Sequence, residues 1–88
     1  MLSQVRVVTV VSLPFYENSY IVWRDGEQTC LVLDPGLEPD LIFAELDRHQ
    51  LRPAAILNTH GHADHIAGNA AMKKRWPDCP LVIGEHET

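Results

Sequence analysis

Three imidazoles and one carboxylate lie within six consecutive residues of this 88-residue chain, at His60, His62, Asp64 and His65. His60 and His62 are two positions apart, so an extended loop would point both imidazoles the same way and let them bind one metal ion. Asp64 and His65 follow where the chain is expected to enter a helix, and they can reach a second ion nearby. Imidazole nitrogen with carboxylate oxygen suits zinc, and also iron or manganese. The ligand segment, residues 60–65, therefore predicts a site for two metal ions.

Such a site has a clear chemical use in hydrolysis. A bound metal lowers the pKa of water towards about 7, and two ions roughly 3.5–4 Å apart can share one hydroxide. That metal-bound hydroxide would attack a carbonyl or phosphoryl centre, and the metal ions would stabilise the oxyanion that forms. Asp64 is the candidate catalytic residue, because it could both bind a metal ion and orient the nucleophile.

The elements that must position this segment are indicated by local patterns. Apolar and β-branched runs predict strands, and a 3.6-residue apolar period with flanking prolines predicts helices. The expected order is β-β-β-α-β-α-β, with strands over 5–11, 19–23, 29–33, 54–58 and 81–83 and helices over 38–49 and 64–75. This order predicts an α/β (α+β) fold in which helices pack on one face of a mixed sheet. The ligand segment then follows a strand end, where such sheets build their sites.

The two faces of the predicted sheet have different expected environments. Strand 29–33 is nearly continuous in apolar character, which predicts that both of its faces are covered. Two helices can cover only one face of the whole sheet well, however. Because exposed apolar surface drives association, we expect self-association through the uncovered face.

Several short motifs resemble one known family. The run His60-x-His62-x-Asp64-His65 matches the HxHxDH signature of the metallo-β-lactamase superfamily. Upstream, Asn18-Ser19-Tyr20 and Asp34-Pro35-Gly36 resemble the Asn-x-Tyr and Asp-x-Gly elements of its hydroxyacylglutathione hydrolase (glyoxalase II)-like branch. The flanks Ile56-Leu57-Asn58-Thr59 and Ile66-Ala67-Gly68-Asn69 are similar as well. The resemblance covers nearly the whole chain.

The resemblance implies roles for individual residues. His60 and His62 would bind the first of two zinc ions, and Asp64 and His65 would bind the second. Asp34 would support the ligand loop without touching a metal ion itself. The implied fold is the N-terminal half of an αββα sandwich, with residues 1–88 as a partial domain that lacks the later metal-ligand segments.

The implied activity is hydrolysis of a small-molecule thioester or ester by a metal-bound hydroxide, as in hydroxyacylglutathione hydrolases. Two alternatives stay open at this point. One is a truncated, non-catalytic remnant with weak or no metal binding. The other is a sulfur dioxygenase-type iron enzyme, which shares the same motif.

Composition narrows the range of partners. The formal net charge is -5, which argues against nucleic acid and anionic membranes, because both need clustered Lys and Arg. No apolar run approaches the roughly 20 residues that a membrane span requires. Cys30 and Cys79 form no CxxC motif, and without a recognisable export signal we expect reduced thiols in a cytoplasmic protein. A bridge between Cys30 and Cys79 stays open.

Overall fold

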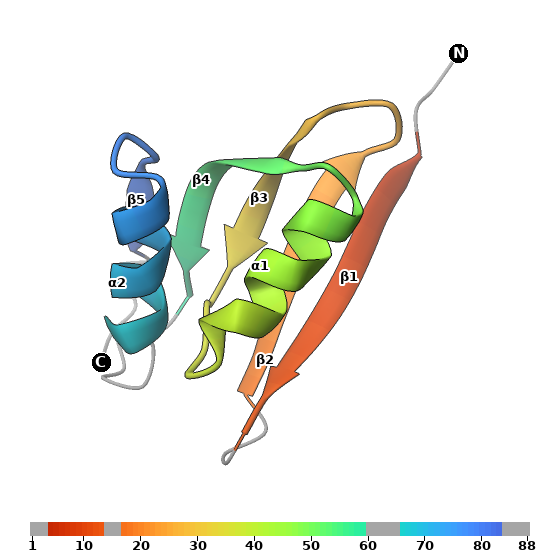
Figure 1. Cartoon of the computed structure of the whole chain (residues 1–88). Helices are drawn as coiled ribbons and strands as arrows, with labels where there is room; N and C mark the ends of the chain where they lie inside the picture. Colours follow the sequence, from red (N-terminus) through yellow and green to blue (C-terminus); the bar gives the residue numbers. More distant parts are fainter. Residues whose placement is uncertain (1–3, 14–16, 60–65, 84–88) are drawn as a thin grey trace.

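Five strands form one mixed sheet in the order in which they occur along the chain (Figure 1). The computed structural model describes residues 4–13, 17–59 and 66–83. Its strands are β1 (Val5–Ser12), β2 (Glu17–Arg24), β3 (Thr29–Leu33), β4 (Arg52–Asn58) and β5 (Leu81–Ile83). Its helices are α1 (Pro39–Arg48) and α2 (Ile66–Arg75). The predicted element order and the mixed sheet are confirmed.

Strand direction follows from the connections. β1, β2 and β3 are antiparallel neighbours, whereas β3–β4 and β4–β5 are parallel pairs. A parallel pair needs a long crossover, and α1 and α2 supply one each. As a result, the C-terminal ends of β3, β4 and β5 reach the same edge of the sheet, and α2 begins there too (Figure 1).

The start of β4 differs from the prediction for a local reason. The strand begins at Arg52 rather than Ala54, so Pro53 lies inside it. Proline cannot donate to the sheet, and it is tolerated at strand starts and at bulges. Here the pairing of β3 with β4 shifts between Cys30 and Leu31: Cys30 lies opposite Pro53, and Leu31 lies opposite Ala55.

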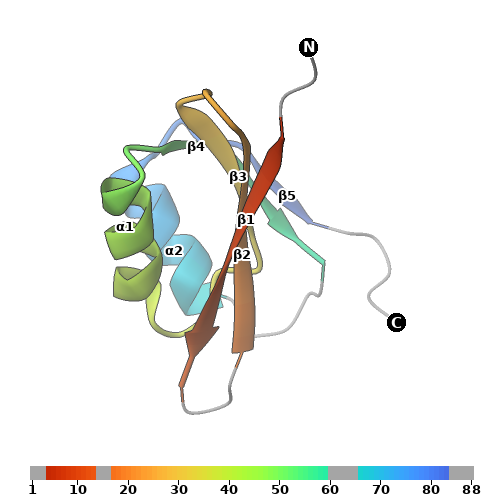
Figure 2. The same ribbon diagram turned by 90° about the vertical axis from the view of Figure 1, so that its right-hand side faces the viewer.

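Both helices pack on one face of the sheet (Figure 2). Paired residues on adjacent strands point to the same face. A central row on the covered face consists of Ile21, Val32 and Ile56, each at most 1% exposed. Ile42 and Leu46 of α1 and Met72 of α2 complete the core with no exposed surface. None of the helices that the structure describes is long and apolar enough to cross a membrane.

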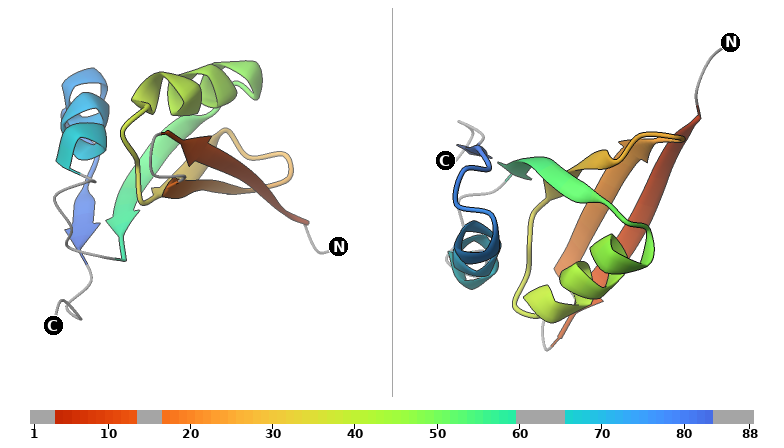
Figure 3. Two further views of the ribbon diagram at one scale, coloured as in Figure 1. Left: turned by 90° about the horizontal axis from the view of Figure 1, so that it is seen from below. Right: turned by 45° about the horizontal axis from the view of Figure 1, so that its top comes forward.

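Neither of the helices that the structure describes lies on the opposite face of the sheet, as the view from below also shows (Figure 3). We call it the open face. Its centre consists of two cross-strand rows: Val7, Val22, Leu31 and Ala55, and then Thr9, Tyr20, Leu33, Leu57 and Val82. No residue in these rows is charged, yet Val7 is 57% exposed and Leu31 37% exposed. The prediction that both faces of strand 29–33 are covered is therefore wrong: its apolar outer side chain faces solvent.

Candidate functional site

Asp34 is the most unusual residue at the sheet edge where the parallel strands end. It follows β3 directly, is 7% exposed, and has a φ of +53°. Asn and Asp are among the few residues other than glycine that adopt this left-handed region readily. The conformation is held from both sides: the Asp34 N–H donates to the Leu57 carbonyl at 2.8 Å, and the Ser19 hydroxyl donates to the Asp34 carbonyl at 2.7 Å.

The Asp34 carboxylate binds the residue that precedes the ligand segment. Its Oδ1 accepts the backbone N–H of Thr59 at 2.7 Å, and its Oδ2 accepts the Thr59 hydroxyl at 2.7 Å. A buried carboxylate needs such partners, and hydrogen bonds to an ionised oxygen are about twice as strong as neutral ones. Asp34 and Thr59 are 25 positions apart in sequence, so this contact joins the end of β3 to the end of β4.

The 34–36 turn is in close contact with other segments on both sides. A Cβ added to Gly36 would lie 2.7 Å from the Ser12 hydroxyl and 3.1 Å from a Glu17 carboxylate oxygen. A Cβ added to Gly68 of α2 would overlap the Gly36 carbonyl and lie 2.5 Å from the Pro35 carbonyl oxygen. The turn therefore lies between the β1–β2 end and the first turn of α2, and the contact of Gly68 with backbone atoms requires glycine.

Polar atoms concentrate at the same edge. Asn58, 4% exposed at the end of β4, donates through Nδ2 to Oδ1 of Asn69 in α2 at 3.1 Å. Within the described residues, three buried side-chain oxygens have no hydrogen-bond partner: Ser12 Oγ, Glu17 Oε1 and Asn58 Oδ1. Buried unpaired polar atoms are rare in folded proteins, and a catalytic or binding role is one of the few explanations for them. These unpaired atoms make this edge a candidate site.

The four candidate metal ligands, His60, His62, Asp64 and His65, lie outside the described residues. Their mutual geometry stays a prediction. Residues 4–13, 17–59 and 66–83 contain no group of three His, Cys, Asp or Glu side chains that could hold a metal ion. Two observations support zinc at this edge. The imidazole and carboxylate donors of the ligand segment suit zinc. The fold also positions the two flanks of that segment, Thr59 before it and α2 after it.

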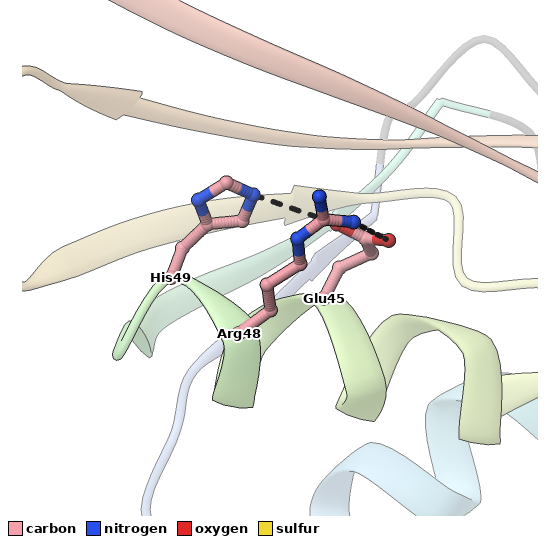
Figure 4. A network of polar contacts seen from close by, with 3 residues as sticks. All are labelled: Glu45, Arg48 and His49. Atoms are coloured by element: carbon pink, nitrogen blue, oxygen red, sulfur yellow. Dashed lines mark ion pairs between the residues drawn. The ribbon is translucent and has the colours of Figure 1, made fainter.

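His49, the one histidine among the described residues, belongs to a surface cluster. His49 ends α1, where its Nε2 lies 3.5 Å from Glu45 Oε1 and its ring is 4.9 Å from the Trp23 ring. Arg48 approaches the same carboxylate at 3.9 Å (Figure 4). Arg48 is a cation in the last turn of α1, where it suits the helix dipole, and the contacts of His49 with Glu45 and Trp23 hold that imidazole away from the candidate site.

The two cysteines are free thiols in the core, and neither reaches the candidate edge. Cys79 Sγ contacts the Pro53 carbonyl at 3.6 Å, and Pro53 is also the sheet partner of Cys30. Burial, with a smaller contribution from Cys79, raises the pKa of Cys30 to about 12. Burial also raises the pKa of Cys79, against a lowering effect of Lys73. Because a thiolate is the reactive and metal-binding form, both residues are structural in this fold.

Comparison with known families agrees with this arrangement of elements. Residues 13–88 match the family model described as the metallo-beta-lactamase superfamily. The chain belongs to the metallo-beta-lactamase superfamily. Among curated superfamily members, a hydroxyacylglutathione hydrolase from Cronobacter sakazakii is 45% identical over 78 residues, which are 88% of this chain and 30% of that protein. The hydroxyacylglutathione hydrolase of Yersinia enterocolitica is 37% identical over 82 residues, 92% of this chain and 32% of that protein.

Solved structures of the superfamily show the same fold. The crystal structure of the BLEG-1 B3 metallo-beta-lactamase aligns with a TM-score of 0.77 and 30% identity, over 86% of this chain and 35% of that one. The structure of ETHE1 from Myxococcus xanthus aligns with a TM-score of 0.70 and 20% identity, over 91% of this chain and 34% of that one, and shows the fold alone. The chain thus spans about a third of the length of the relatives it matches.

Sequence reasoning identified Asp34 but missed the residues around it. Thr59, Asn58, Gly68 and Asn69 were visible only as flanks of the ligand segment. A glycine inside a helical pattern is one signal that could have been followed, because it often marks a close backbone approach. What approaches Gly68 is the 34–36 turn, more than 30 positions earlier, and sequence spacing cannot reveal that partner.

Proposed function

We propose that this chain carries the first metal-binding segment of a zinc-dependent hydrolase that cleaves a small-molecule thioester or ester. The observation that carries the proposal is the Asp34 carboxylate, which holds both the N–H and the hydroxyl of Thr59 at 2.7 Å, directly before His60. In metal sites, hydrogen-bonding groups that do not touch the metal commonly orient the residues that bind it. A buried carboxylate bound to the residue directly before a four-ligand segment fits that arrangement. The similarity to hydroxyacylglutathione hydrolases supports the choice of substrate class.

The ligand roles in this proposal follow the donor set. His60 and His62 would hold one zinc ion, and Asp64 and His65 would hold a second. Zinc would supply a water of lowered pKa and positive charge for the oxyanion of the transition state. Asp64 would also orient the nucleophile, and Asp34 would fix the direction in which the chain leaves β4.

We also propose that residues 1–88 correspond to the N-terminal portion of a larger catalytic domain. The relatives that match are about three times as long, since the chain covers 30% and 32% of them. A catalytic zinc site usually has three protein ligands and one open position, so two ions need more ligands than the segment offers. The cytoplasmic location stays a prediction.

Zinc binding by the purified chain is the first test. We expect His62→Ala to weaken zinc affinity by at least about tenfold, because even loss of an outer-layer partner costs roughly 10–100-fold and His62 would be a direct ligand. Titration against a chromophoric chelator measures this affinity. The matched control is His49→Ala, which removes an imidazole that is held by Glu45 at the end of α1. Equal binding by wild type and His62→Ala would contradict the metal-site proposal.

Activity and metal content then separate the alternatives. Zinc-dependent cleavage of an S-acylated glutathione, lost in His62→Ala, would establish a hydrolase. Zinc binding without turnover in this chain would favour a non-catalytic remnant. Purification with one iron ion in place of two zinc ions would favour the dioxygenase-type alternative.

A second copy of the chain is the partner that we propose for the open face. The two central rows of this face lack charged side chains, and Arg24 lies beside Val5 at one end of it, so pairing with a second copy about a two-fold axis would be centred on the two rows. We expect Val7→Lys or Leu31→Lys to convert a dimer to a monomer, as measured by light scattering. Leu41→Lys is the matched control, because Leu41 is 41% exposed but lies on α1, which packs on the other face. A wild-type chain that is monomeric and monodisperse at high concentration would contradict this proposal.

A further inference from the structure

The 34–36 turn contacts the chain on both sides of the ligand segment. On the near side, the Asp34 carboxylate holds Thr59, the residue before His60. On the far side, Gly68 lies three positions after His65, and a Cβ added to it would overlap the Pro35 and Gly36 carbonyls. Two points nine positions apart in sequence are thereby attached to one buried three-residue turn.

A second contact joins the same two sides without the turn. Asn58 is the last residue of β4, and its side-chain amide donates to Asn69 of α2 at 3.1 Å. Asn58 is 4% exposed, so the donor end of this part-buried hydrogen bond is shielded from competing water. The end of β4 and the first turn of α2 are therefore connected twice, once directly and once through the 34–36 turn.

We infer that Gly68 and Asn69 are positioning residues for the ligand segment: they fix where α2 begins relative to the end of β4. The 60–65 segment joins the end of β4 to the start of α2. If the distance between these two ends is fixed, the segment has fewer conformations to lose when it binds a metal ion, and binding is stronger. The inference rests on the proposed function, because it takes the 60–65 segment as the metal-binding segment. It concerns residues that touch neither metal nor substrate.

The contact at Gly68 cannot be relieved by side-chain movement. The atoms that an added Cβ would meet are backbone atoms of Pro35 and Gly36, so either α2 or the turn must shift. Asp34 is part of that turn, and its carboxylate has to stay aligned with two donors on Thr59. A methyl group at position 68 should therefore loosen a hydrogen bond nine residues earlier in the chain.

Hydrogen exchange of the metal-free chain tests the coupling without any metal. In Gly68→Ala we expect the Thr59 amide to exchange about tenfold faster relative to the Val32 amide, which reports global unfolding in the central strand. The matched control is Ala70→Gly, at an exposed position of the same helix. It weakens the helix but should leave the ratio of the two exchange rates unchanged.

Zinc affinity supplies the second readout. We expect Gly68→Ala and Asn69→Ala each to bind zinc about tenfold more weakly than wild type, and Ala70→Gly to bind as wild type does. Asn69→Ala keeps the test available if Gly68→Ala does not fold. Wild-type exchange of Thr59 together with wild-type zinc affinity in a folded variant would overturn the inference. A wild-type chain that binds no zinc would instead overturn the proposed function, and unchanged Thr59 exchange would still overturn the coupling.

Discussion

Replacing Asp34 by alanine is expected to lower the free energy of unfolding by about 3 kcal/mol. The substitution removes two hydrogen bonds to an ionised carboxylate, each worth roughly 1.5–3 kcal/mol, although neighbouring contributions do not add fully. It also leaves alanine at a φ of +53°, a region that its Cβ disfavours by about 1–2 kcal/mol. Urea denaturation followed by tryptophan fluorescence measures the change, since Trp23 and Trp76 both pack against the core.

Two further variants separate the causes of this loss. Asp34→Asn tolerates the left-handed backbone and keeps one acceptor for the Thr59 N–H, so it should lose less stability than Asp34→Ala. Thr59→Val removes the hydroxyl and keeps the N–H. If Asp34 acts through Thr59, the effects of Asp34→Asn and Thr59→Val should be non-additive in the double variant. A loss below about 1 kcal/mol in Asp34→Ala would mean that the buried carboxylate contributes little to the stability of the fold.

Replacing Ile56 by alanine should have an effect of similar size for a different reason. Ile56 has no exposed surface and lies beside Val32 on the covered face, so its truncation leaves a cavity in the only core that the described residues form. Such truncations cost about 2–5 kcal/mol. In a domain of this size that corresponds to a fall in Tm of roughly 15 °C, measurable by circular dichroism.

Leu31→Ala is the matched control on the neighbouring strand. Leu31 points to the open face and is 37% exposed, so its truncation should change Tm by only a few degrees. If Leu31→Ala destabilised the isolated monomer as much as Ile56→Ala, the division of the sheet into a covered and an open face would be wrong.

The 34–36 turn contacts several segments at the edge of the sheet where the candidate site lies. Ser12 and Glu17 lie close to Gly36 on one side of the turn, and Gly68 lies against its backbone on the other. The Asp34 carboxylate binds Thr59. Segments that are distant in sequence therefore depend on one buried turn. A single substitution in this turn should therefore change both the stability of the fold and the position of the residues that flank the ligand segment.

The sequence alone determined the order of elements. Strand and helix periodicity, prolines and turn residues are local signals, and they predicted all seven elements in the correct order. The sequence also determined the superfamily and the place of the candidate metal ligands, because a four-ligand motif lies within six residues. Those ligands are outside the described residues, so their arrangement around a metal ion stays a prediction.

The tertiary structure decided which residues support that motif and which face of the sheet is open. The apolar pattern of strand 29–33 suggested two covered faces, but only the packing of both helices on one side showed that Leu31 is exposed. The contacts from Asp34 to Thr59 and from Gly68 to Pro35 depend on strand pairing and crossovers between segments 25 or more positions apart. Local sequence records the conformational preference of each residue, whereas its partners are set by the register of the whole sheet.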